Sequence, residues 1–384
     1  MKKIFLIIWA DVKFYQTISF TSKFFDENGY KIYIFYRKPN DKEDFVGKVD
    51  FGKNVQLVPI QFSSLNKINY LFFLAKCFFK KLIINPSTII FYDRKALFCN
   101  ILIQIIKKRT KLIYHNFDFN IPQKNSISEK ILNKLEFYLA KKVDLLIFAS
   151  IKIGYEFCNH SFIDLNKKKM IEIKNCFPKN FIPKKSNELD IFLKEKNVIN
   201  KKIVCRLGTL GPNHYIENII KSVKYWNEDL ILILGGTIID NYKQKIDKLI
   251  EDENVIGKIF LFEFINSEKW FEILFKSKIG ICFYDENISI TNRHMSRASS
   301  KLSNYIFANI PFVANKNKDF EELIKNHNVC KLVNVNDPKE IAEKINFIYE
   351  NENVYIELKQ NSKKSFVQEF NFNNDFDQLL QILK

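Results

Sequence analysis

The feature of this 384-residue sequence that most limits its fold is an alternation of short apolar runs with helical runs, and the alternation occurs twice. The first series extends from Lys3–Trp9 to Leu145–Ala149, and the second extends from Ile203–Leu207 to Phe312–Ala314. Strands that alternate with helices predict right-handed βαβ units on a parallel sheet. The sequence therefore predicts an α/β protein with two Rossmann-like, doubly wound domains that face a cleft.

A linker is predicted between the two series, where residues 183–187 read Pro-Lys-Lys-Ser-Asn. Single cores stop growing at roughly 250–300 residues, so two domains suit a chain of this length. We expect an N-terminal domain over residues 1–180 and a C-terminal domain over 190–360. A helix over 361–384 is expected to return to the first domain.

The cysteines and the apolar runs limit the cellular setting. The seven cysteines are odd in number and form no C-x-x-C pair, which disfavours a disulfide framework or a zinc site and fits a reducing cytosol. No run of about 18 uncharged apolar residues is present, so no transmembrane helix is predicted. The apolar start is interrupted by Asp11 and Lys13 and favours a buried strand over a signal peptide.

The positive charge is concentrated in the first half of the chain. The net charge is +17, and residues 1–180 hold 31 Lys and Arg against 15 Asp and Glu, whereas the remainder holds 29 against 28. A basic half predicts an anionic partner, such as a membrane surface, nucleic acid or a phosphorylated substrate. The absence of RNP-like, KH or helix-turn-helix sequences argues against nucleic acid.

One predicted helix suggests which anionic partner is involved. Residues 66–83 combine Phe and Leu with several lysines, and residues 107–111 add a basic run. Together they suit contact with an anionic bilayer. A core helix with a solvated basic edge fits the same pattern.

The most informative segment for chemistry is residues 297–314. Ser299 or Ser300 is suited to cap a helix, and the cations Arg293 and Lys301 lie close by in the sequence. A helix N-terminus with free N–H groups and nearby cations suits a diphosphate. An ordinary capped helix with a basic first turn fits these local features equally well.

This segment resembles the donor-binding stretch of family-4-type GT-B glycosyltransferases (glycosyl transferases group 1), which runs close to P-N-K-L-x-E-Y-x-A-x-G-x-P-V-V-A. Lys301, Tyr305 and Pro311 are among the matching residues. Asn304 and Ser296 stand where the family has the two glutamates of its E-x7-E pattern. The resemblance implies that Asn304 hydrogen-bonds the ribose of the donor, as an amide is both donor and acceptor.

Other segments agree with the family in order and spacing. Leu207-Gly208-Thr209 resembles its G-R-L loop, with Thr209 in place of the arginine and His214 in place of a later lysine. Gly235-Gly236 resembles the G-x-G turn, where glycine lets backbone approach the nucleotide. The resemblance covers nearly the whole chain. The donor-binding residues expected on these grounds are Arg206, Gly208, Thr209, Gly235, Gly236, Arg293, Ser299, Ser300, Lys301 and Asn304.

Candidate residues for the acceptor side end a predicted strand in the first half. Residues 111–118 resemble the family's V-Y-D-x-H-D segment, with the histidine displaced to His115 and Phe117 in its usual place. On this basis His115 orients the acceptor or the donor sugar and Asp118 acts as a base. A satisfied histidine at a strand end fits the same pattern.

The predicted function is transfer of a sugar from a nucleotide-diphosphate donor to a glycan or polyprenyl-linked acceptor in surface polysaccharide synthesis, at the inner face of the membrane. No D-x-D motif is present in a strand–loop context, so we expect no metal and no cofactor, with the helix dipole and cations neutralising the leaving diphosphate. The resemblance implies retention at the anomeric carbon. The alternative, favoured by the missing glutamates, is an inactive GT-B relative that serves as a partner or scaffold.

Overall fold

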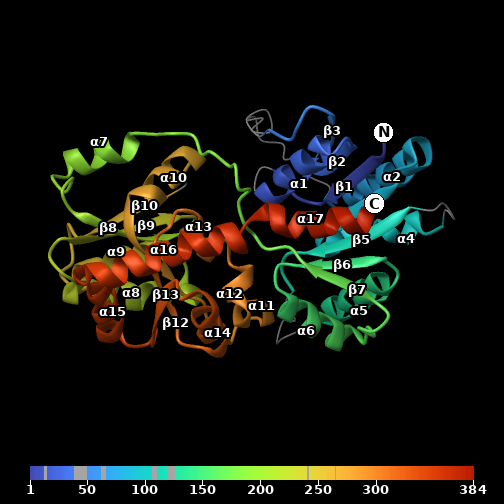
Figure 1. Ribbon diagram of the computed structural model, residues 1–384. Coiled ribbons are helices and arrows are strands. Elements are labelled where there is room, and N and C mark those ends of the chain that lie inside the picture. Colours follow the sequence, from blue (N-terminus) through green and yellow to red (C-terminus); the bar gives the residue numbers. More distant parts are fainter. Residues whose placement is uncertain are drawn as a thin grey trace. The chain divides into compact units, whose positions relative to one another are not determined.

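The computed structural model describes residues 1–12, 15–38, 50–61, 66–105, 110–119, 126–239, 242–263 and 265–384. The chain forms two compact units (Figure 1). The first contains Met1–Lys174 and Phe372–Lys384, and the second contains Asn175–Asn371. The predicted linker at 183–187 therefore lies inside the second unit, and the chain passes between the units at Lys174/Asn175 and again at Asn371/Phe372.

The first unit is built on a seven-stranded parallel sheet with the order β3-β2-β1-β4-β5-β6-β7. The chain winds outward in both directions from β1 and β4, so the order reverses between these two strands. The strands are β1 (Lys3–Ile8), β2 (Lys31–Lys38), β3 (Val55–Gln61), β4 (Thr88–Tyr92), β5 (Lys111–Asn116), β6 (Leu145–Phe148) and β7 (Lys169–Glu172).

The strands β1, β4 and β6 are almost wholly buried, which explains their continuous apolar sequences. The connecting helices are α1 (Gln16–Glu27), α2 (Asn66–Ile84), α3 (Asp93–Leu97), α4 (Asn100–Ile103), α5 (Ile127–Lys141) and α6 (Ile151–Ser161). Between β4 and β5 the chain forms two short helices, α3 and α4, which are separated at Phe98 and Cys99. Residues 106–109, and with them most of the basic run at 107–111, lie outside the described residues.

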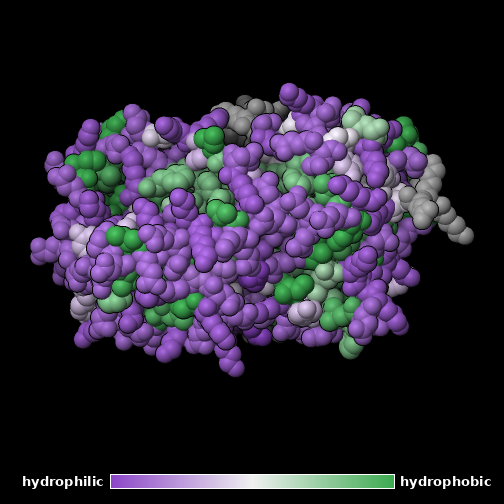
Figure 2. Space-filling model, in the orientation of Figure 1, coloured by the Kyte–Doolittle hydropathy of each residue, from purple (hydrophilic) through white to green (hydrophobic). Residues whose placement is uncertain are grey.

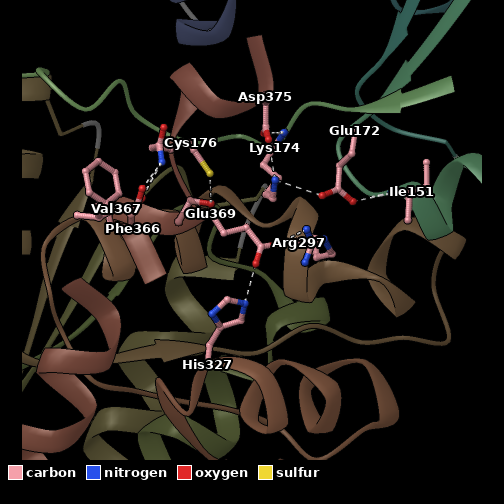
Figure 3. Close-up of polar contacts among 12 residues, drawn as sticks. Ile151, Glu172, Lys174, Cys176, Arg297, His327, Phe366, Val367, Glu369 and Asp375 are labelled. Carbon is pink, nitrogen blue, oxygen red and sulfur yellow. Dashed lines mark hydrogen bonds and ion pairs between the residues drawn. The ribbon is translucent and has the colours of Figure 1, made fainter. Parts of the chain in front are cut away.

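The C-terminal helix α17 (Phe372–Leu383) completes the first unit and packs against α1 (Figure 1). Phe372 and Phe376 stack on each other with ring centroids 3.9 Å apart, and Phe24 of α1 contacts both rings. The buried Asp375 accepts hydrogen bonds from the backbone N and Nζ of Lys174, each 2.8 Å long (Figure 3). Lys174 Nζ also lies 3.3 Å from Glu172, so its charge is balanced on two sides. These contacts fix α17 to the end of β7.

The second unit repeats the architecture with a six-stranded parallel sheet of order β10-β9-β8-β11-β12-β13. Here the order reverses between β8 and β11. The strands are β8 (Lys202–Leu207), β9 (Leu230–Gly236), β10 (Ile259–Glu263), β11 (Ser277–Cys282), β12 (Phe312–Asn315) and β13 (Cys330–Val333). The two doubly wound sheets confirm the predicted fold class.

Helices and two 3-10 turns connect these strands, and their apolar faces form the core of the second unit. In chain order they are α7 (Glu188–Glu195), η3 (Pro212–His214), α8 (Ile216–Ser222), η4 (Val223–Tyr225), α9 (Tyr242–Asp252), α10 (Ser267–Lys276), α11 (Ile290–Arg293), α12 (Met295–Ala298), α13 (Ser300–Phe307), α14 (Lys318–His327), α15 (Pro338–Glu350) and α16 (Glu352–Gln368). Because α16 continues to Gln368 within this unit, the segment that joins the first unit begins at Phe372 rather than at residue 361.

The exposed face of α2 is unusually apolar for a surface helix. Its buried side contains Phe73, Cys77 and Lys81, whereas six large hydrophobic side chains are exposed. These are Ile68, Leu71, Phe72, Phe79, Leu82 and Ile83. At 3.6 residues per turn they fall in one stripe about 120° wide, and Figure 2 shows hydrophobic side chains among polar ones in the region of α2. Within the described residues, no helix has both the length and the apolar character needed to cross a membrane.

Candidate active site

The carboxyl ends of β8 and β9 form the base of a candidate site in the second unit. The loops that leave these strands run together, with Gly208 N donating to Gly235 O over 2.8 Å. Gly236 has φ +138°, and a Cβ atom there would lie 2.2 Å from Gly208 O. Only glycine allows this approach without displacing the backbone. The predicted glycines thus bring together the loops after β8 and β9, beside the point between β8 and β11 where the strand order reverses. Ligands bind at such points in doubly wound sheets.

Arg206 lies on β8 immediately before this loop and is completely buried. Within the described part of the chain, its Nε, Nη1 and Nη2 atoms have no hydrogen-bond partner. Burial lowers the pKa of Arg206, and its leading electrostatic neighbours are Tyr305 and Tyr284 rather than a carboxylate. A buried guanidinium without an anionic partner is costly. No carboxylate is therefore among the leading electrostatic neighbours of this buried positive charge in the described part of the chain.

Lys301 adds a second cation next to Arg206. It is half-buried on α13, and its Nζ donates to Tyr284 Oη over 2.9 Å and lies 4.3 Å from the centre of that ring. A Cβ atom on Gly208 would be 3.0 Å from Lys301 Cε and 3.4 Å from Arg206 Nη1. Burial and the nearby Arg206 lower the pKa of Lys301 to about 7. The two cations thus flank Gly208, with Arg206 enclosed and Lys301 accessible.

His214 is a third member of this cluster that the sequence did not identify as a site residue. It is half-buried at the end of η3, and its Nδ1 atom is 3.4 Å from Phe283 O. Burial, followed by the charges of Lys301 and Arg206, lowers the pKa of His214 to about 3, so the ring is neutral. The sequence signal that points to His214 is its position, because it stands where the resembled family has a lysine.

Ser299 and Ser300 have different surroundings although both precede or begin α13. Ser299 Oγ accepts from Leu302 N over 3.1 Å as the N-cap of α13, and it lies 2.6 Å from Tyr284 Oη. Ser299 therefore links the cap of the helix to the ring beneath Lys301. Ser300 is exposed at the first position of the helix.

Three further predicted donor residues make fewer contacts with the cluster. Thr209 is exposed in the loop after β8, and Asn304 is half-buried within α13. Arg293 is exposed on α11 and donates from Nε to Glu286 O over 3.2 Å. The structure therefore brings Arg206, Gly208, Ser299 and Lys301 together, and adds His214 and Tyr284.

A second candidate site lies in the first unit, again where the strand order reverses. A pocket of about 370 Å³ opens at the carboxyl ends of β1, β4 and β5. Its walls combine aromatic rings with carboxylates. The lining residues include Trp9, Tyr15, Tyr92, Asp93, Arg94, Lys95, Asn116, Asp118, Phe119, Glu129 and Glu136.

Asp93 is the most unusual residue of this pocket. It follows β4 directly and has φ +63°, a left-handed conformation that is uncommon outside glycine. Its Oδ1 accepts from Phe117 N over 2.9 Å, which fixes the carboxylate against the end of β5. Burial, with additional repulsion from Asp118 and Glu136, raises the pKa of Asp93 to about 7. Strained, titratable residues of this kind are concentrated at functional sites.

The two predicted acceptor-side residues have different surroundings. Asp118 lines the pocket, and its side chain is accessible there. Partial desolvation by the surrounding protein raises the pKa of Asp118. His115 is buried on β5 between the rings of Tyr92 and Phe117, at centroid distances of 5.2 and 4.6 Å. Burial lowers the pKa of His115 to about 3, and the residue is not part of the pocket wall.

A buried polar network supports the floor of the pocket. Tyr114 Oη donates to Glu136 Oε1 over 2.6 Å, and Asn116 Nδ2 donates to Tyr114 Oη over 2.8 Å. Arg94 Nη1 donates to Glu129 Oε2 over 3.0 Å. Among the described residues, no group of three or more His, Cys, Asp or Glu side chains is arranged to hold a metal ion.

A Ser–His–Glu contact elsewhere in the second unit has a structural role. His327 Nδ1 lies 3.0 Å from Ser365 Oγ. Its Nε2 lies 2.9 Å from Glu369, as Figure 3 shows. The order resembles a hydrolase triad. Ser365 is buried, however, and Glu369 also binds Arg297, so the group joins α12, α14 and α16 rather than exposing a nucleophile.

The geometry of both units defines a class of protein: two doubly wound parallel sheets, each with a candidate ligand site where its strand order reverses. Comparison with solved structures finds the same architecture across the whole chain. HepE of Anabaena, solved with UDP and glucose, matches with a TM-score of 0.74 at 17% identity and covers 100% of this chain and 99% of its own. A glycosyltransferase of Rickettsia africae matches with 0.72 at 15% identity, covering 100% and 98%. Sucrose-phosphate synthase of Thermosynechococcus elongatus matches with 0.69 at 12%, covering 100% and 98%.

The family comparison agrees with the shared fold. Residues 190–365 match the family model of glycosyl transferases group 1, and this range lies within the second unit. A comparison with curated proteins gives no match. The solved structures show that the chain has the GT-B fold, and the family match of the second unit agrees with the predicted resemblance to GT-B glycosyltransferases.

Proposed function

We propose that the protein transfers a sugar from a nucleotide-diphosphate donor, held by the second unit, to a glycan or lipid-linked acceptor bound by the first. The observation that carries the donor assignment is the pair of cations, Arg206 and Lys301, at the end of β8 and on α13. Their leading electrostatic neighbours include no carboxylate. A diphosphate would supply the missing negative charge. The structure of HepE with UDP and glucose supports UDP as the nucleotide to test first.

In this proposal the cations stabilise the leaving group. The bond between the anomeric carbon and the diphosphate oxygen breaks, its electron pair remains on the diphosphate, and the new bond forms to an acceptor hydroxyl oxygen. Lys301 contacts the developing charge directly, while Arg206 acts from beneath Gly208 through a medium of low dielectric constant. Fixed cations of this kind replace a metal ion. The resemblance to family-4-type enzymes favours retention, with the hydroxyl proton passing to the departing phosphate.

We further propose that the first unit rests on an anionic membrane surface, which would bring it to a lipid-linked acceptor used in surface polysaccharide synthesis. The exposed apolar stripe of α2 supports this assignment, because Phe72 is 66% exposed and Ile83 is 76% exposed. Lys76 is exposed and Lys80 half-buried along the edge of this stripe. An amphipathic helix with lysines beside its apolar face binds anionic lipid surfaces.

Isothermal titration calorimetry with UDP, GDP and CMP tests the donor assignment. We expect UDP to bind the wild type and the variant Lys301→Met to bind it about 10- to 150-fold more weakly, since a charge-assisted hydrogen bond contributes roughly 1.5–3 kcal/mol. The control Lys224→Ala removes an exposed lysine paired with Glu253 and should leave the dissociation constant unchanged. A wild type that binds none of the three nucleotides would refute the donor assignment and favour the alternative of an inactive scaffold.

A further inference from the structure

We propose that the pocket of the first unit recognises an uncharged, hydroxyl-bearing sugar ring of the acceptor, with the carboxylate of Asp93 and the amide oxygen of Asn116 accepting hydrogen bonds from its hydroxyls. This inference rests on the proposed function and assigns the chemical class of the acceptor. Neither residue was a candidate from the sequence. Four features of the pocket support it: its size, an unused acceptor, a fixed carboxylate and the sign of its charge.

The size and walls of the pocket suit a sugar ring. Its volume of about 370 Å³ is at the lower end of the range of roughly 300–1,000 Å³ that is typical of small-molecule sites. Trp9, Tyr15 and Phe119 give it apolar surfaces, and carboxylates and an amide give it hydrogen-bonding groups. A sugar ring has the same division, with apolar C–H faces and hydroxyls around its edge.

Asn116 provides a buried acceptor that the described protein does not use. The residue is 97% buried and lines the pocket. Its Nδ2 donates to Tyr114 Oη over 2.8 Å and to Glu136 Oε1 over 3.3 Å. These two bonds fix the amide orientation, and Oδ1 has no hydrogen-bond partner among the described residues. An unsatisfied buried acceptor costs roughly 1–3 kcal/mol, so a hydroxyl donor in the pocket would stabilise it.

Asp93 provides a carboxylate in a fixed position. Its left-handed backbone and the bond from Phe117 N to Oδ1 hold the group at the carboxyl end of β4. No described contact occupies Oδ2, which remains for a ligand. Hydrogen bonds from a hydroxyl to an ionised carboxylate are roughly twice as strong as neutral ones. Such a bond would offset part of the cost of the strained backbone at this position.

The charge around Asp93 selects against anionic ligands. Asp118 and Glu136 act on it electrostatically from the end of β5 and from α5, and Glu129 is a further carboxylate of the wall. Arg94 is already bonded to Glu129. The pocket wall thus contains two cations, Arg94 and Lys95, and four carboxylates. The carboxylates are Asp93, Asp118, Glu129 and Glu136. An acceptor ring bearing a carboxylate or phosphate would be repelled, whereas a neutral ring would be accepted.

Ligand-observed NMR titration at pH 8 tests this inference with methyl glycosides of glucose, galactose, mannose and N-acetylglucosamine, and with the anionic methyl glucuronide. We expect at least one neutral glycoside to bind the wild type and the glucuronide to bind at least tenfold more weakly. Asp93→Asn should weaken the neutral glycoside at least fivefold. Asparagine tolerates the left-handed conformation and can keep the bond to Phe117 N, so the backbone should be preserved. Glu156→Gln on α6 is the matched control and should have no effect.

Two further measurements keep the inference distinct from the proposed function. Asp118→Asn, a change of an exposed residue, should strengthen methyl glucuronide binding about threefold or more because one repelling charge is lost. UDP binding is measured on the same samples. If UDP binds but no neutral glycoside does, or if Asp93→Asn binds the glycoside as the wild type does, the acceptor class is wrong while the donor assignment stands. If UDP does not bind, the proposed function itself fails.

Discussion

The affinity for a sugar nucleotide should depend on pH through Lys301. Burial and the nearby Arg206 lower the pKa of this lysine to about 7 in the free protein. A bound diphosphate favours the charged form and raises the pKa, so binding above pH 7 takes up a proton. About nine-tenths of the free protein carries the charge at pH 6, and about one-tenth at pH 8. The dissociation constant should therefore rise about tenfold between these values, equivalent to about 1.4 kcal/mol.

The assay is calorimetric titration of UDP-glucose at pH 6, 7 and 8 at constant ionic strength. A sugar nucleotide is preferred to UDP because its diphosphate is a diester and has no proton that titrates in this range. The other groups around Lys301 do not titrate there. His214 is neutral because its pKa is lowered to about 3, and burial raises the pKa values of Tyr284 and Cys282.

Lys301→Met supplies the control for this prediction. The variant should bind UDP-glucose weakly and with the same affinity at all three pH values, and its circular dichroism should match the wild type. A wild-type dissociation constant that stays constant from pH 6 to 8 would refute the role of Lys301. A variant that keeps the tenfold dependence would assign it to another group.

Three further predictions concern stability and the surface. Gly236→Ala should lower the free energy of unfolding, measured by urea titration, by about 3 kcal/mol, since φ is +138° and the new Cβ would lie 2.2 Å from a backbone oxygen. Gly257→Ala is the control, with φ +81° and no atom within 4 Å of the new Cβ, and it should lower the free energy of unfolding by about 1 kcal/mol. His327 and Arg297 lower the pKa of Glu369 to about 2. The carboxylate therefore stabilises the fold above its unfolded pKa near 4.5, and this stabilisation is lost as the pH falls towards 2. The difference in melting temperature between the wild type and Glu369→Gln should shrink from about pH 7 to about pH 3.5. Leu71→Glu should reduce sedimentation with phosphatidylglycerol vesicles at least fivefold, whereas Ile256→Glu, an equally polar change at an exposed position of the second unit, should not.

The donor-side features that the sequence predicted are those encoded by local pattern. Glycines directly after two apolar strands predict a close turn, and Gly208 and Gly236 occupy one. Ser299 precedes a helical pattern and is the cap of α13. Lys301 follows in the first turn of that helix. Such features depend on neighbours within a few residues, so the sequence contains most of the information that determines them.

The pocket of the first unit was only partly predictable because its properties come from residues far apart in the chain. Asp93 follows a strand as Asp118 does, but its left-handed backbone appears only in the structure. Its pKa is raised by burial and then by the charges of Asp118 and Glu136, which lie after β5 and on α5. Glu136 is one acidic residue among several on an amphipathic helix until Tyr114 and Asn116 are placed beside it. His115 attracted attention as a histidine at a strand end, but its burial among rings depends on the packing of β4 against β5.

The two candidate sites, at the points where the strand orders reverse, differ in the sign of their charge. This difference bears on what the positive charge of the first half of the chain is for. The site of the second unit, whose sequence is nearly neutral overall, contains cations whose leading electrostatic neighbours among the described residues include no carboxylate, as the proposed anionic donor would require. The pocket of the first unit is rich in carboxylates although residues 1–180 carry an excess of 16 basic residues. That excess therefore does not serve the ligand of the pocket. Charge placed away from the pocket suits a large anionic surface at the periphery of the unit, where the exposed apolar face of α2 lies, and Leu71→Glu tests this without altering either ligand site.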